Sequence, residues 1–174
     1  MFKLKRVLIA AGVAVTAGAL VGTAAYAIVN SRTGTFSERQ TFVHSTDPFS
    51  TGSTTFVNVP SAVRSVTVPS GTTRMIDARF TAESFCGGSG GWCSVRIVVV
   101  TPTGAVVEMD PASNSDYAFD SGTGADNWEG HALERTSRFL TAGTYRVQVQ
   151  TRVVSGATSI RLDDWTLAVE TIRP

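Results

Sequence analysis

The chain has 174 residues, of which 43% are apolar and 17% charged, and its formal net charge is +1. This length suits one domain, and the apolar content is enough for a buried core, which argues against a wholly disordered chain. The near-neutral charge argues against a nucleic-acid-binding protein that works by neutralising phosphates. No glycine or proline period indicates collagen, and no internal repeat indicates a solenoid.

The first 27 residues have the pattern of a signal peptide. Lys3, Lys5 and Arg6 form a basic start, a long apolar run follows, and Ala25 and Ala27 place small residues where signal peptidase reads. We therefore expect cleavage after residue 27 and a secreted, extracellular mature chain. An uncleaved membrane anchor is the alternative, because the apolar run is long enough to span a bilayer.

The remainder of the chain carries 12 arginines, no lysine and all 14 acidic residues, which is a formal charge of −2. Residues 28–40 are polar and patternless, so we expect a flexible linker there. A single β-sandwich domain is expected to follow over residues 41–174. In that domain apolar residues alternate with period two between Gly, Pro, Asn, Asp and Ser, and no convincing helical period occurs.

This pattern predicts an all-β fold, an antiparallel β-sandwich of jelly-roll type with roughly eight to ten strands. An immunoglobulin topology is less favoured because the Cys…Trp…Cys spacing of that fold is missing. The clearest strands cover residues 73–84, 92–100 and 144–154. Weaker candidates cover residues 54–59, 64–68, 105–109, 116–120 and 131–140.

The last predicted strand has a break in its alternation. Ile160 and Leu162 are two residues apart, whereas Trp165 and the apolar residues after it continue on odd numbers. A β-bulge or tight turn at Asp163 and Asp164 would absorb the extra residue and restore one apolar face. This interpretation makes Trp165 a core residue.

The two cysteines, Cys86 and Cys93, flank a glycine-rich segment, and a disulfide between them is expected in an exported protein. We expect it to close a β-hairpin, in which antiparallel register would place Glu83 directly across from Arg96. The glycine-rich segment also matches the G-x-S-x-G nucleophile pattern at Ser89. That pattern needs a strand-to-helix turn, so a flexible turn is the preferred interpretation.

An acidic, glycine-containing stretch covers residues 110–134. Calcium prefers clustered carboxylates and carbonyls on such loops, although the spacing matches no EF-hand or β-roll pattern. We therefore expect no cofactor, with calcium as the possible exception. The candidate metal ligands are Asp116, Asp120, Asp126 and Glu129. His131 lies close by, and a cleft that gathers Asp120, Asp126 and Glu129 with His131 would favour a hydrolase.

Three tryptophans offer aromatic surfaces. Trp92 and Trp128 lie in or beside polar loops, so both are candidate ligand-binding residues for a sugar or another surface ligand.

Five segments carry a resemblance to known sequences: residues 82–86, 92–97, 117–121, 143–147 and 161–165. Through them the chain resembles a group of small, exported, uncharacterised proteins of actinobacterial type that have β-sandwich folds. The resemblance implies no activity and no catalytic residue, because none is assigned to that group.

We therefore expect a secreted, non-catalytic β-sandwich module for binding or surface interaction at the cell envelope. Its partner would be a cell-surface polysaccharide or protein, with no nucleic acid and no membrane contact beyond an uncleaved signal segment. The alternatives are a small secreted hydrolase that uses the acidic loop residues with His131, and a structural subunit of a homo-oligomer.

Overall fold

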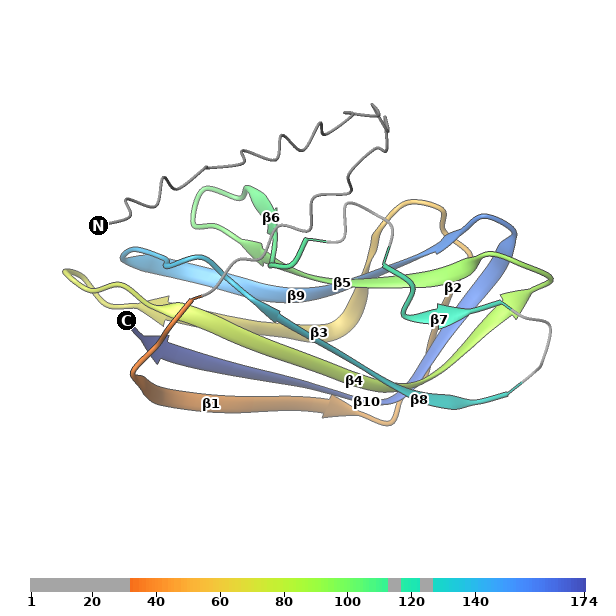
Figure 1. Cartoon of the computed structure of the whole chain (residues 1–174), viewed down its shortest axis with the longest axis horizontal. Helices are drawn as coiled ribbons and strands as arrows, with labels where there is room; N and C mark the ends of the chain where they lie inside the picture. The colour runs from red at the N-terminus through yellow and green to blue at the C-terminus, as the bar shows by residue number, and fades with distance from the viewer. Residues whose placement is uncertain (1–31, 113–116, 123–126) are drawn as a thin grey trace, which may run out of the picture. The chain divides into compact units, whose positions relative to one another are not determined.

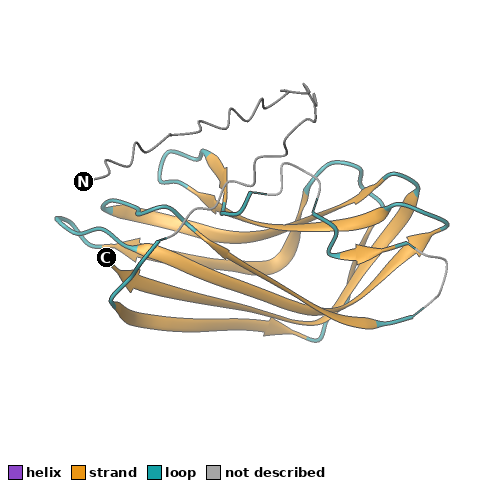
Figure 2. Ribbon diagram, viewed as in Figure 1, coloured by secondary structure: helices purple, strands orange, loops and turns teal. Residues whose placement is uncertain are grey.

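The computed structural model describes residues 32–112, 117–122 and 127–174. Across these ranges the chain forms ten β-strands and no helix (Figures 1 and 2). The described part of the chain accordingly contains no helical segment with the length and hydropathy needed to cross a bilayer. The strands are β1 (Phe36–Ser45), β2 (Phe49–Thr51), β3 (Val57–Val68), β4 (Met75–Gly88), β5 (Trp92–Val100), β6 (Val106–Glu108), β7 (Asp120–Ser121), β8 (Glu129–Thr136), β9 (Gly143–Val154) and β10 (Ala157–Arg173).

Two antiparallel sheets pack face to face. Sheet A has the order β1-β10-β4-β8, with β2 paired to β10, and sheet B has the order β3-β9-β5-β6, with β7 paired to β5. The longer strands alternate between the sheets along most of the chain, and Figure 1 shows the resulting two layers. This is the jelly-roll arrangement that the strand pattern predicts.

The core lies between the sheets and follows the predicted faces. On β9 the inward side chains of Tyr145, Val147, Val149 and Val153 are all buried. On β5 even the outward Val98 is buried, which agrees with the prediction that both faces of this strand are covered.

The predicted break in β10 is confirmed. The register against β4 shifts between Asp163 and Thr166, and Asp164 takes a positive φ of 42°. As a result Leu162 and Trp165 are both buried between the sheets, although they are three positions apart, an odd spacing that would place them on opposite faces of a regular strand.

Cys86 and Cys93 form the predicted disulfide, but the predicted hairpin is wrong. Cys86 belongs to β4 in sheet A and Cys93 to β5 in sheet B, so the bond joins the two sheets. Glu83 lies across from Asp163 of β10 and Gly130 of β8 instead of Arg96. A short connection favours pairing of the two strands in one sheet, whereas here the chain crosses to the other sheet between β4 and β5.

Arg96 pairs with Gln150 of β9, and its guanidinium forms an ion pair with Glu108 at 3.3 Å. Its actual partners therefore lie within sheet B.

The expected linker over residues 28–40 is too long, because β1 begins at Phe36 and pairs along its length with β10. Glu38 accepts hydrogen bonds from Arg74 and Arg173, and these bonds lower the pKa of its carboxyl group. A polar edge strand of this kind carries little alternation, which is why the sequence did not reveal it. The predicted signal peptide lies outside the described residues.

The weaker strand candidates shift at their ends. The two candidates over residues 54–68 merge into β3, whose pairing with β9 is interrupted between Asn58 and Val63. The candidate over residues 131–140 starts earlier and ends at Thr136 as β8, and the candidate over residues 116–120 is seen only as the short β7.

Candidate binding site at the edge of the sandwich

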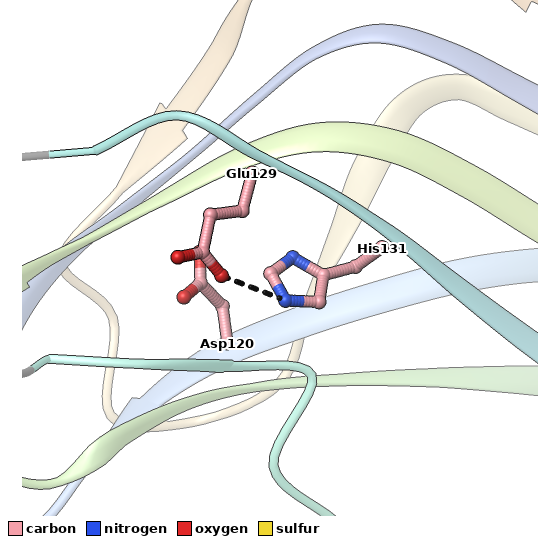
Figure 3. Close-up of side chains that lie close together, drawn as sticks. All are labelled: Asp120, Glu129 and His131. Atoms are coloured by element: carbon pink, nitrogen blue, oxygen red, sulfur yellow. Dashed lines mark ion pairs between the residues drawn. The ribbon is translucent and has the colours of Figure 1, made fainter.

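A cluster of polar side chains lies where the edge strand β8 of sheet A approaches β7 of sheet B. In β8, Glu129 pairs with Ser84 and His131 with Ala82, and both partners are buried, inward-facing residues of β4. Side chains opposite each other share a face of the sheet, so Glu129 and His131 also face the second sheet. Asp120 of β7 meets them from that sheet (Figure 3).

Hydrogen bonds connect this cluster into a chain. The Ser84 hydroxyl donates to Asp120 Oδ2 at 2.7 Å, and Ser84 Oγ lies 2.9 Å from His131 Nδ1. On the other side of the ring, His131 Nε2 lies 3.5 Å from Glu129 Oε2, the contact drawn in Figure 3. The His131 ring also packs on Phe119, with ring centroids 5.4 Å apart, which restricts the ring further.

The solvent exposure of the side chains rises from Ser84 through His131 to Glu129. Ser84 is fully buried, whereas the His131 side chain is 27% exposed and the Glu129 side chain 61% exposed. A buried hydroxyl that donates to a carboxylate cannot reach a substrate, so Ser84 is not placed as a nucleophile. Ser84 instead positions the imidazole and the Asp120 carboxylate.

The arrangement is suited to holding a cation. Asp120, Glu129 and His131 each offer one ligand atom, and these atoms all lie within 4.8 Å of one another. Two of the four sequence-predicted metal ligands, Asp120 and Glu129, are therefore brought together. The other two, Asp116 and Asp126, lie outside the described residues.

Sequence reasoning considered His131 only as a hydrolase residue and did not single out Ser84. The signal for Ser84 was present, because it continues the inward side of β4 after Phe80 and Ala82. A small polar residue at an inward position near the end of an apolar face needs a polar partner, and here it has two.

An aromatic patch lies on the outer face of sheet A beside this cluster. Trp128, which directly precedes β8, is 45% exposed, and its ring lies 6.1 Å from that of Phe85. The Arg161 guanidinium lies 5.1 Å from the Trp128 ring and forms an ion pair with Asp163 at 3.4 Å. Next to Trp128, Gly130 has no neighbour within 4 Å of where a Cβ would stand, so this part of the face is open.

Trp92 does not join this patch. It directly precedes Cys93, which faces the core from β5, so Trp92 lies on the outer face of sheet B. The two tryptophans proposed as ligand contacts therefore face away from each other, and one compact ligand cannot touch both. Trp128 is the more exposed of the two.

Two of the other hollows in the described part of the chain bear on the search for a site, and both lie away from this cluster. One, of about 550 Å³, opens beside β6 and is lined by apolar groups including Met109 and Phe139. A smaller one on the outer face of sheet A holds Asp77, Glu134 and Glu170. Burial raises the pKa of Asp77 to about 6, and the two neighbouring carboxylates add to this rise.

No protein-family model matches this chain, and a comparison with curated proteins finds no match. The resemblance to small exported actinobacterial proteins therefore stays a prediction.

Proposed function

We propose that this chain is an exported, non-catalytic β-sandwich module that binds a polysaccharide at the cell envelope through the patch around Trp128. The observation that carries this proposal is the exposed Trp128 ring, held against Phe85 and Arg161 beside open space at Gly130. An aromatic ring offers an apolar platform for the C–H face of a sugar ring. Nearby charged groups can hydrogen-bond to its hydroxyl groups.

The polar groups around the ring have the required chemistry. Arg161 and Asp163 are joined at 3.4 Å, and Glu83 lies directly across from Asp163. These side chains supply donors and acceptors on one face of the sheet, and a sugar can exchange bonds at low cost with Arg161 and Glu83, which are exposed. An exposed ring on the outer face of a sheet suits one face of a polymer better than a small molecule that must be enclosed.

A binding assay with matched variants tests this proposal. We expect the purified protein to sediment with insoluble cell-wall polysaccharide and Trp128→Ala to lose at least tenfold in affinity, because the platform is gone. Phe42→Ala is the control, since Phe42 is also an exposed aromatic residue on the outer face of sheet A, on β1. Equal losses in both variants, or binding that survives Trp128→Ala, would contradict the proposal.

Export is the second element of the proposal. The disulfide between Cys86 and Cys93 is typical of an oxidising compartment, and the first 27 residues have the pattern of a signal peptide. We expect the intact mass of protein from culture medium to correspond to a chain beginning at Ile28. Recovery of residues 1–27 still attached in the membrane fraction would refute cleavage.

A small hydrolase is the second candidate, favoured by the convergence of Asp120, Glu129 and His131. Glu129 is solvated and adjacent to His131, so the pair could move a proton to or from a bound water. A screen with generic ester, phosphoester and glycoside substrates distinguishes the candidates. Turnover that disappears in Glu129→Gln and persists in Trp128→Ala would favour the enzyme over the binding module.

A further inference from the structure

We propose that Asp120, Glu129 and His131 form a site for a divalent transition metal ion of the zinc class, which links the two sheets. This proposal does not depend on the polysaccharide, because its residues face between the sheets whereas Trp128 faces outward. It rests on the orientation of His131, on the spacing of the ligand atoms and on their types.

The first argument is the tautomer of His131. Ser84 has one hydroxyl proton, and it donates this proton to Asp120 Oδ2 at 2.7 Å. The contact of 2.9 Å between Ser84 Oγ and His131 Nδ1 must then use a proton on Nδ1. In the neutral ring this leaves Nε2 with its lone pair, the form in which imidazole binds metals. A histidine that donates its other N–H to a fixed neighbour is the usual arrangement at a metal site.

The second argument is what Nε2 faces. Among the residues that the structure describes, its ion-pair partner is Glu129, whose Oε2 lies 3.5 Å away. In the neutral tautomer, a lone pair on nitrogen and a carboxylate oxygen face each other without a proton between them, which is unfavourable. A cation between the two atoms removes this repulsion and uses both lone pairs. The competing explanation is a protonated ring that forms an ion pair with Glu129, and the experiment below distinguishes the two.

The third argument is distance. Zinc binds histidine nitrogen and carboxylate oxygen at about 2.0–2.2 Å, so neighbouring ligand atoms of a tetrahedron are about 3.4 Å apart. The separation of 3.5 Å between His131 Nε2 and Glu129 Oε2 matches such an edge. All three ligand atoms lie within 4.8 Å of one another, and the exposed Glu129 side chain is free to shorten the remaining separation.

The ligand types favour zinc over calcium. Calcium takes six to eight oxygen ligands, whereas this set offers two carboxylates and one imidazole nitrogen. Imidazole with carboxylates suits zinc and its neighbours in the first transition row. Three protein ligands leave one tetrahedral position for water on the exposed side of Glu129.

The position of the site gives the ion a structural effect. Asp120 lies in sheet B and is the direct cross-strand partner of Cys93, while the other two ligands lie in sheet A. The ion would thus join the sheets beside the disulfide, at the end where β7 and β8 approach. Because the ion would bind the folded chain and not the unfolded chain, it should raise the melting temperature of the protein.

Calorimetry with Zn²⁺ on the purified protein tests this site. His131→Asn keeps a donor at the place of Nδ1 for Ser84 but lacks Nε2, so we expect at least a hundredfold weaker binding. His44→Asn is the matched control, because His44 is the only other histidine and is exposed on β1, and it should bind like the parent protein. Ser84→Ala should weaken binding by about tenfold to a hundredfold, as loss of an orienting partner does.

Spectroscopy gives a readout that does not depend on the variants folding well. Co²⁺ bound to the parent protein should show the intense visible absorption of tetrahedral cobalt with a nitrogen ligand, and excess Zn²⁺ should remove it. Three outcomes would overturn the proposal: no such spectrum, equal loss of Zn²⁺ affinity in His131→Asn and His44→Asn, or preference for Ca²⁺ that is insensitive to His131→Asn. A parent protein that binds no Zn²⁺ would contradict the proposal as well, and the His131–Glu129 contact would then be an ion pair of the protonated ring.

Discussion

Truncation of Trp165 tests the interpretation of β10, because this side chain is buried only through the bulge at Asp163 and Asp164. Trp165 is 2% exposed and packs against Phe80 with ring centroids 6.1 Å apart. Burial of about 200 Å² of side-chain surface at about 25 cal/mol per Å² gives about 5 kcal/mol, an upper value because the unfolded chain is not fully extended. Because the two sheets cannot collapse into the space, we expect Trp165→Ala to lower the free energy of unfolding by roughly 3–5 kcal/mol.

Trp128→Ala provides the comparison. Trp128 is 45% exposed, so the same arithmetic gives less than about 3 kcal/mol, and solvent fills the vacated space without a cavity. We expect a loss of about 1–2 kcal/mol for this variant. Urea unfolding followed by far-ultraviolet circular dichroism measures both, since tryptophan fluorescence itself changes in the variants. At roughly 2–4 °C per kcal/mol, Trp165→Ala should lower the melting temperature by roughly 6–20 °C. Equal losses in the two variants would refute the assignment of Trp165 to the core.

The other predictions concern the disulfide, the bulge and the buried carboxyl group. Replacing Cys86 and Cys93 together by Ala should lower the free energy of unfolding by about 2–3 kcal/mol, because the bridge has a sequence separation of 7, and the lost sulfur atoms add the cost of a cavity. A melting temperature equal to that of the parent protein would disprove a structural role for the disulfide. Asp164→Val should destabilise the fold by about 1–2 kcal/mol because of the positive φ of 42°, whereas Asp164→Gly should be tolerated; similar stability of the two in urea would argue against the bulge. The pKa of Asp77 is raised from 3.8 to about 6, so the folded chain binds more protons than the unfolded chain in that window and stability falls as pH rises through it. Asp77→Asn should remove this fall and stabilise the protein at pH 7 by about 1–2 kcal/mol after allowance for solvent screening. Urea unfolding at several pH values measures this effect. The same fall in stability with rising pH in the variant and in the parent protein would contradict the prediction.

The sequence by itself determined which residues are buried. Alternation along β4, β9 and β10 indicates which side of each strand meets the core, because successive side chains of a strand point to opposite faces. The same rule predicted the bulge at Asp163 and Asp164 from the change of parity alone. The disulfide followed from cysteine count and context, since Cys86 and Cys93 have no other partner.

Only the tertiary structure decided which strands are neighbours. Alternation carries no information about the sheet that a strand joins, so the crossing of the chain between β4 and β5 could not be seen, and the expected pairing of Glu83 with Arg96 was wrong. The polar cluster of Asp120, Glu129 and His131 also depends on which sheet each strand joins. Asp120 reaches His131 because β7 and β8 join different sheets that face each other at one edge, and the buried Ser84 fixes both groups there. These contacts are set by long-range packing of the sheets, which the local pattern of residues does not encode.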